Sequence, residues 1–534
     1  MRRLKSAGLA ALFACALAVS PAEAADSTSA FIRCDGNPAK ISAGELLGRV
    51  VLLTATMGIA GAPPHKDLSQ RANGIDGVQA CDAALMEERD PIRKVQLMLA
   101  RSIHHIESKQ YGLAVEDART APTLAGALAD DYGFRHSLLL SSLDLQAAAL
   151  VRDGKFAEAE AAALKLADAA PYDVTAQTSV RRYTHLTGTL SPETQAYLDR
   201  VVKIFPDALV TRALAYQWVG RYLDAANDYA SIIDVRAAFA QPGSGASPPP
   251  DAMAMRAVML AMGGKLDEAA TVADDTRAVI RALSSTGKAG LMQASIDSAE
   301  AALDFENVVA DLAAGRASAA RVKFAARSRW TSPPAPAVAA LAAQLRQGAK
   351  PEELTGLLAT DPATLRADAI AASAGAITEA SGADAALYNL IRPPLTMEIY
   401  RDWSGDVWDT KSSVFLHQKT AKENYVGELL VMPFGRPRLF SGPRTITVAA
   451  GDALLMHAAL LAQSRNQKSF ELFPSRKEFQ ATFVKLGNPG EPGMVAAVSY
   501  DAATVISDLS GEFPEPRARG VGDAAKAAQA DAQR

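Results

Sequence analysis

The hydrophobic pattern of residues 71–330 is typical of short helices joined by polar turns. Alanine- and leucine-rich stretches end at a glycine, and an alanine follows five positions later. Glycine adopts the positive φ that ends a helix, and a small alanine lets the next helix pack closely. The pattern therefore predicts antiparallel helix pairs that cannot bury their apolar faces alone. The turn residue and the alanine of successive copies, of which the first and last are fainter, are Lys109 and Ala114, Gly154 and Ala159, Gly220 and Ala225, Gly264 and Ala269, and Gly315 and Ala320.

The copy that turns at Gly154 carries further features. It continues with Phe156 and Ala159 and ends at Pro171, and in this it resembles the second half of a tetratricopeptide repeat (TPR). The resemblance implies an α-solenoid with a concave binding surface. Successive alanines are spaced 45, 66, 44 and 51 residues apart, whereas the family period is about 34. The repeats are therefore degenerate, or extra helices lie between them; a generic array of helical hairpins is the alternative.

The opening of the repeat region, residues 74–121, has its own rhythm. It contains Ala80-Cys81-Asp82-Ala83-Ala84-Leu85, then Ala100-Arg101, then Ala114-Val115-Glu116-Asp117. This resembles the start of repeat proteins of bacterial envelopes, in which the middle pair has the reverse order. The resemblance favours an envelope protein.

Two proline-rich stretches interrupt the helical pattern. Residues 241–251 (QPGSGASPPPD) predict a loop between repeats, and residues 331–337 (TSPPAPA) predict the end of the repeat region. More alanine-rich helix is expected from residue 338 to about residue 381. It belongs to a helical extension over residues 331–384.

The composition changes near residue 385. Short β-like runs separated by Gly and Pro turns surround a helix predicted over residues 452–467. We expect a separate α+β domain over residues 385–512, followed by a disordered tail over residues 513–534. The predicted strands are 413–416, 425–432, 445–448, 470–473, 481–486 and 494–500. The fold class is thus mainly α, a degenerate TPR-like α-solenoid followed by a small α+β C-terminal domain.

The first 24 residues predict a cleaved secretory signal peptide. Three basic residues precede an apolar run over residues 7–19, and Ala22-Glu23-Ala24 places small residues at a cleavage site. An N-terminal segment over residues 25–70 then precedes the repeats. No later segment has the length and apolar character of a transmembrane helix. We therefore expect a periplasmic protein without a transmembrane segment in the mature chain.

The cysteines support export. Removal of residues 1–24 leaves Cys34 and Cys81, and two cysteines in an oxidising compartment predict a disulfide. Two buried thiols are the alternative. Leu12-Phe13-Ala14-Cys15 resembles a lipobox, so an outer-membrane lipoprotein anchored at Cys15 is a second possible location.

The charge balance bears on the partner. The 55 Lys and Arg residues and 59 Asp and Glu residues nearly cancel, which leaves no basic excess to neutralise a phosphate backbone. Nucleic acid is therefore not expected as a partner.

Candidate chemistry is sparse. None of the seven histidines forms the H-E-x-x-H spacing of a zinc site. Gly243-Ser244-Gly245 lies in a proline-rich loop and lacks the strand-to-helix context of the G-x-S-x-G motif of serine hydrolases. Ser285-Thr286-Gly287-Lys288 matches S-x-x-K but lacks the K-T-G that accompanies it in penicillin-binding proteins. We predict no metal, no cofactor and no catalytic residue.

The expected function is protein binding by a periplasmic scaffold, with a peptide or a partner protein of the cell envelope on the first helix of each pair. A small hydrolase or ligand-binding module in the C-terminal domain is the alternative, and a cavity joining Asp452, His457 and the tryptophan-rich stretch 400–409 would favour it. Aromatic and acidic residues of that stretch could form a ligand platform, or its tryptophans could seal the domain. The candidate binding residues are Gln146, Leu150, Arg212, Gln217, Trp403 and Trp408.

Overall fold

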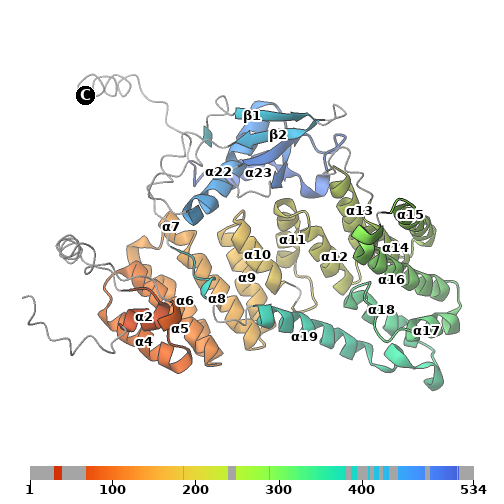
Figure 1. Ribbon diagram of the computed structural model, residues 1–534, viewed down its shortest axis with the longest axis horizontal. Coiled ribbons are helices and arrows are strands. Elements are labelled where there is room, and N and C mark those ends of the chain that lie inside the picture. Colours follow the sequence, from red (N-terminus) through yellow and green to blue (C-terminus); the bar gives the residue numbers. More distant parts are fainter. Residues whose placement is uncertain are drawn as a thin grey trace, which may run out of the picture. The chain divides into compact units, whose positions relative to one another are not determined.

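The computed structural model is mainly helical, with a small sheet near the C-terminal end (Figure 1). The chain divides into two compact units, Met1–Ala127 and Leu128–Arg534. Among the described helices, none combines the length and apolar character needed to cross a bilayer. The structure describes residues 29–38, 68–184, 186–238, 248–287, 289–380, 387–393, 407–408, 414–419, 425–431, 443–474, 481–513 and 515.

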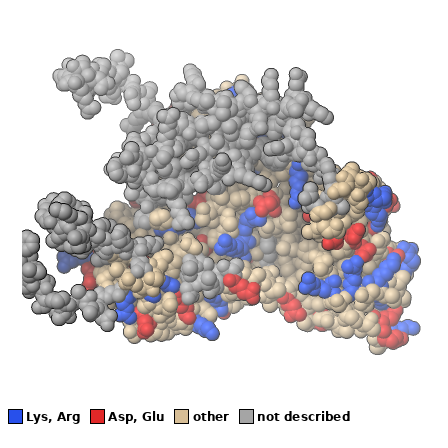
Figure 2. Space-filling view, in the orientation of Figure 1, with Lys and Arg blue, Asp and Glu red and all other residues tan. Residues whose placement is uncertain are grey.

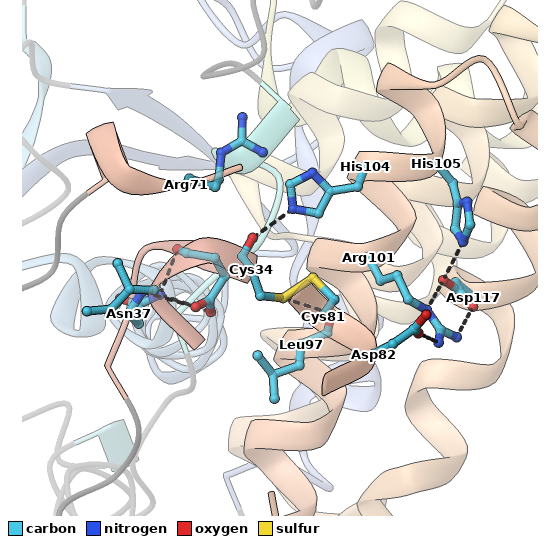
Figure 3. The surroundings of a disulfide bond; sticks show 12 residues. Cys34, Asn37, Arg71, Cys81, Asp82, Leu97, Arg101, His104, His105 and Asp117 are labelled. Carbon is cyan, nitrogen blue, oxygen red and sulfur yellow. Dashed lines mark hydrogen bonds and ion pairs between the residues drawn. A yellow bond between two sulfur atoms is a disulfide. The ribbon is translucent and has the colours of Figure 1, made fainter. Parts of the chain in front are cut away.

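Helix α2 is fixed to its neighbours in the first unit by a disulfide and buried polar contacts. Cys34 of α2 and Cys81 of α4 form the disulfide that the cysteine count predicts (Figure 3). His104 of α5 is fully buried, and its Nε2 lies 2.8 Å from the carbonyl oxygen of Cys34. Asp35 and Arg93 form a buried ion pair between α2 and α5. The described elements are α2 (Ala30–Asp35), η1 (Leu68–Gln70), α4 (Gly74–Glu87), α5 (Pro91–Glu107), α6 (Tyr111–Thr120) and η2 (Ala121–Leu128), which ends at the boundary.

The helices of the second unit pack mainly on their neighbours in the chain (Figure 1). Helices α8 and α9, α12 and α13, α14 and α15, and α16 and α17 form pairs. We name α8, α10, α12, α14 and α16 the A helices and α9, α11, α13, α15 and α17 the B helices. The bounds are α7 (Tyr132–Arg135), α8 (Leu138–Arg152), α9 (Phe156–Ala169), α10 (Val174–Tyr183), α11 (Pro192–Ile204), α12 (Ala208–Trp218), α13 (Tyr222–Ala238), α14 (Pro250–Met262), α15 (Leu266–Ser285), α16 (Ala289–Ala313) and α17 (Ala317–Ala325).

All five predicted turns have the same backbone geometry. Lys109, Gly154, Gly220, Gly264 and Gly315 have φ between 59° and 81°. In each turn, the N–H of the next residue donates to the carbonyl five residues earlier at 2.8–2.9 Å, the six-to-one bond of a Schellman motif. The alanine five positions after each turn residue is 0% exposed. Pro171 follows Ala170, the C-cap residue of α9.

The 66-residue gap between Ala159 and Ala225 holds two further helices. Helices α10 and α11 lie between α9 and α12, joined by residues 184–191, of which His185 lies outside the described residues. Helix α10 packs on α8 and α9, and α11 packs on α9 and α12. The gap therefore contains two more helices, whose connection lacks the glycine-to-alanine frame.

After α17 the chain returns along the array. It forms α18 (Ala335–Arg346), η3 (Pro351–Glu353), η4 (Gly356–Ala359) and α19 (Pro362–Ala380), within the alanine-rich region expected to be helical. Arg366 of α19 donates to the carbonyl oxygens of Gly188 and Trp218, and its guanidinium lies 4.7 Å from the Trp218 ring centroid. Helix α19 also packs on α8. The return segment thus runs back from the last helix pairs to the first (Figure 1).

The sheet has the strand order β1-β2-β4-β3-β5, with every neighbour antiparallel. Two strand predictions were wrong. Residues 445–448 belong to α22; within residues 494–500 the structure has a short 3-10 turn, η6 (Ala496–Val498), and only Tyr500 belongs to a strand, β5. The elements are β1 (Val414–Lys419), β2 (Tyr425–Val431), α22 (Pro443–Ser464), β3 (Ser469–Pro474), β4 (Ala481–Gly487), β5 (Tyr500–Asp501) and α23 (Ala502–Leu509).

The sheet region shares its core with the helical region. Tyr132 of α7 and Tyr172, between α9 and α10, belong to the same buried cluster as the apolar residues of α22 and α23. The Tyr172 hydroxyl donates to Asp508 at 2.6 Å. The α+β region expected to be a separate domain therefore buries part of its apolar surface on the first helices of the second unit.

Candidate binding surface

Arg212, expected to contact a partner, instead joins three helices. Its Nε and Nη2 donate to the two carboxylate oxygens of Asp228 on α13 at 3.0 and 2.6 Å. Its Nη1 donates to Asp199 on α11 at 2.7 Å. The Arg212 side chain is only 13% exposed. Burial is the largest influence on Asp228 and raises its pKa, although the guanidinium opposes the shift.

The same arrangement occurs in the first unit. Arg101 of α5 donates through Nε and Nη2 to Asp117 of α6 at 2.7 and 2.6 Å, and through Nη1 to Asp82 of α4 at 2.5 Å (Figure 3). In both units the arginine stands eight residues before the turn residue, Lys109 or Gly220, and the paired aspartate stands eight residues after it. We name this arrangement the Arg–Asp clasp.

Neither clasp was predicted from the sequence, although the residue pattern around both is present. The rhythm noted around Arg101 recurs as Arg212-Ala213 followed by Ala225-Ala226-Asn227-Asp228. Elsewhere the aspartate is replaced. Arg256 of α14 occupies the clasp position of the pair that turns at Gly264, but Val272 stands opposite it. Arg256 is half-buried and has no hydrogen-bond or ion-pair partner among the described residues.

The other candidate binding residues lie in less accessible places than expected. Leu150 and Gln217 are 6% and 2% exposed, so burial removes both from the surface that a partner could reach. Gln146 is half-buried, and its amide donates to Ser142 at 3.2 Å. Trp408 is partly buried against the core, where its indole N–H donates to the carbonyl of Phe513. Trp403 lies outside the described residues.

A polar cluster lies between the A helices α8 and α10. Asp144 of α8 is buried and accepts hydrogen bonds from Ser179 at 2.6 Å and Tyr183 at 3.3 Å, both on α10. Burial raises the pKa of Asp144, against the opposing effect of these bonds and of Arg392. Together with Ser141 and Asp173, these residues form what we name the α8–α10 face.

Arg392 of the chain's own segment 387–393 contacts this face. The backbone N–H of Arg392 donates to the Ser141 hydroxyl at 2.9 Å, and its Nη1 donates to Asp173 at 3.1 Å. Leu387 is 3% exposed. Asp173 also caps α10 by accepting from the N–H of Ala176. Arg392 Nη2 is buried and has no hydrogen-bond partner among the described residues.

A shallow hollow of about 470 Å³ lies where α19 passes the turn between α8 and α9. Phe156, Leu186 and Ile370 supply its apolar lining, and Lys155, Glu158 and Thr187 supply polar groups. It is open to solvent, so it would not bury most of a ligand's surface as enclosed ligand pockets do.

Titratable groups from distant parts of the second unit meet around His136. Its Nδ1 lies 3.9 Å from Asp452 of α22, its Nε2 lies 3.9 Å from Glu512, and its ring stacks on Tyr132. Arg135 donates to both oxygens of Glu512. Burial raises the pKa of Asp452 to about 7, with His136 opposing the shift. These groups join α7 to the sheet region.

The candidate catalytic features are buried or fall outside the described residues. Asp452 and His457 are each 3% exposed, and His457 Nδ1 is hydrogen-bonded to the carbonyl of Val407 at 2.7 Å. Residues 243–245 and Lys288 lie outside the described part. Within the described ranges, no group of three His, Cys, Asp or Glu residues is placed to hold a metal ion.

Lysines and arginines alternate with acidic residues over the exposed helices on the face shown in Figure 2. This mixture fits the near-neutral net charge of the chain.

No family model, no curated protein and no solved structure matches this chain. The chemistry of the described residues is therefore the basis on which a function can be proposed.

Proposed function

We propose that this chain is an exported TPR-like α-solenoid that binds a peptide or a partner protein of the cell envelope on its A helices. The five turns of one geometry, each followed by a fully buried alanine, are the observation that carries the proposal. Within the second unit, a stack of such pairs would present one continuous surface because each pair buries its apolar face on the next.

Two further observations support a repeat array. The 66-residue gap between Ala159 and Ala225 holds two additional helices, and its length is close to twice the family period of about 34 residues. The Arg–Asp clasp recurs at one repeat position in two helix pairs.

Export is supported by the N-terminal sequence and by the Cys34–Cys81 disulfide, because disulfides persist in oxidising compartments. The mature chain would then act in the periplasm. Labelling with a lipid precursor tests the alternative of an outer-membrane lipoprotein, since only a chain anchored at Cys15 would incorporate it.

Affinity capture with the full mature chain from a periplasmic extract tests the binding proposal. The test variant combines Arg182→Glu and Arg256→Glu on the A helices α10 and α14. The matched control combines Lys165→Glu and Arg281→Glu on the B helices α9 and α15; Arg182, Lys165 and Arg281 are exposed and Arg256 is half-buried.

The A-helix variant should capture at least five-fold less partner than the unaltered chain. The control variant should capture the same amount as the unaltered chain. Equal capture by both variants, or no partner with the unaltered chain, would overturn the proposal. Unchanged melting temperatures would show that both variants remain folded.

A further inference from the structure

We propose that the α8–α10 face recognises a short segment that carries an arginine. Within this chain the segment is residues 387–393, and a partner with an equivalent arginine-bearing segment can replace it. This inference rests on the proposed scaffold function and adds the chemistry of the partner.

The acceptor groups of this face match an arginine. Asp173 presents one carboxylate oxygen to the guanidinium while its other oxygen caps α10, so its position is fixed by the helix itself. The Ser141 hydroxyl accepts the backbone N–H of the arginine. Arginine is the side chain that best exploits carboxylates in partly buried sites, because its planar guanidinium carries several donors and stays charged.

The internal segment, residues 387–393, is compact and has a buried leucine and an ion-paired arginine. The N–H groups of Leu390 and Ile391 donate to the carbonyls of Leu387 and Tyr388, which forms a single helical turn. Leu387 is buried at one end, and the Arg392–Asp173 ion pair, with side chains 11% and 2% exposed, closes the other. The element that contacts the face is therefore the arginine, and the internal segment carries a buried leucine five residues before it.

The fit leaves donor capacity unused. Arg392 Nη2 is buried without a hydrogen-bond partner among the described residues, and a buried unpaired donor weakens binding. Asp144 lies on the same face, where Ser179 and Tyr183 donate to one of its two carboxylate oxygens. A partner whose arginine also reached Asp144 would compete with the internal segment despite the advantage that its attachment to the chain provides.

The test uses a labelled peptide of sequence LYNLIRP, residues 387–393, and the full mature chain. In the variant Leu387→Ser/Arg392→Ser, the internal segment lacks its buried leucine and the arginine that pairs with Asp173. We expect this variant to bind the peptide with micromolar affinity and the unaltered chain to bind it at least ten-fold more weakly. Adding Asp173→Asn, which keeps a capping side chain, should weaken binding at least ten-fold, while Asp168→Asn at an exposed position of α9 should not.

A folded double variant that fails to bind the peptide at millimolar concentration would overturn the proposal. If that variant does not fold, Leu387→Cys in the otherwise unaltered chain replaces it, and excess peptide should speed labelling of this protected thiol at least five-fold. No acceleration would contradict the proposal.

The outcomes also separate this proposal from the scaffold function. Capture that depends on Arg182 and Arg256, without peptide binding, supports the scaffold alone and rejects the α8–α10 recognition site. Peptide binding without any captured partner supports the recognition site and rejects the envelope scaffold.

Discussion

Arg212 and Asp228 stand eight residues before and eight residues after Gly220 in the sequence, and two hydrogen bonds join them in an ion pair between α12 and α13. The third guanidinium nitrogen of Arg212 donates to Asp199 of the preceding B helix, α11. One side chain thus connects three helices. Arg101 makes the same three contacts around Lys109. The shared geometry indicates that this repeat position stabilises the stacking of helix pairs.

Loss of the clasp should destabilise the array. Arg212→Lys removes the fork that binds both oxygens of Asp228, and we expect the free energy of unfolding to fall by about 1–3 kcal/mol because a partly buried carboxylate loses its partner geometry. Denaturant titration measures this change. Arg256→Lys is the matched control at the same repeat position without an aspartate, and it should change stability by less than about 0.5 kcal/mol. Equal effects of the two substitutions would show that the clasp contributes nothing specific.

Substitutions at two of the turn residues should change stability in opposite directions. Gly154 has φ 73°, and a Cβ added there would meet no neighbouring atom, so Gly154→Ala should cost about 1 kcal/mol through backbone strain alone. Lys109 adopts φ 59° in the equivalent turn, so Lys109→Gly should stabilise the first unit by up to about 1 kcal/mol. Thermal melts of both variants measure these shifts, and two changes of the same sign would contradict the shared geometry.

The repeats illustrate which parts of this fold are predictable from sequence. The turn residues and alanines were recognisable because steric demands at those positions restrict them to few residue types. Extra helices between the repeats were one of two alternatives, and α10 and α11 could not be located because the connection over residues 184–191 lacks that frame. The β-branched run at residues 445–448 favours a strand locally, but it extends α22 in the structure, and tertiary context routinely overrides such preferences.

The candidate site was less predictable for a geometric reason. Degenerate spacing leaves the rotation of each helix undetermined, and rotation decides whether Leu150 and Gln217 face solvent or the interior. The contacts of Arg392 with Ser141 and Asp173 span more than 200 residues, and no local pattern encodes them. The packing of Tyr132 and Tyr172 into the sheet region is equally non-local.

The disulfide should stabilise the first unit. Cys34 and Cys81 are 47 residues apart, and closing a loop of this length stabilises by about 4 kcal/mol in the chain-entropy model. Cys34→Ser/Cys81→Ser should therefore lower the melting temperature, and a reductant should lower that of the unaltered chain but not that of the variant. Identical melts of the oxidised chain and the variant would show that buried contacts such as Asp35–Arg93 suffice.

The junction around His136 should make stability depend on pH. The pKa of Asp452 is about 7 in the folded chain and about 3.9 when unfolded, so the folded state binds more protons between these values. Stability contributed by this group is present below pH 4 and is lost as pH rises to about 7. Asp452→Asn should remove that decline and exceed the unaltered chain at pH 8 by about 1–4 kcal/mol. If the free energies of unfolding of the unaltered chain and of Asp452→Asn changed in parallel from pH 4 to pH 8, the raised pKa of Asp452 would be contradicted.

The most direct test of the central claim is site-specific photo-crosslinking in living cells. A photoreactive residue replaces Thr178 or Arg256 on the A helices, and Lys165 or Arg281 on the B helices, one position at a time in the full chain. The scaffold proposal predicts adducts with a common partner from the A-helix positions and few or none from the B-helix positions. Adducts only from the B-helix positions, or equally from both sets, would contradict the claim that the A helices form the binding surface.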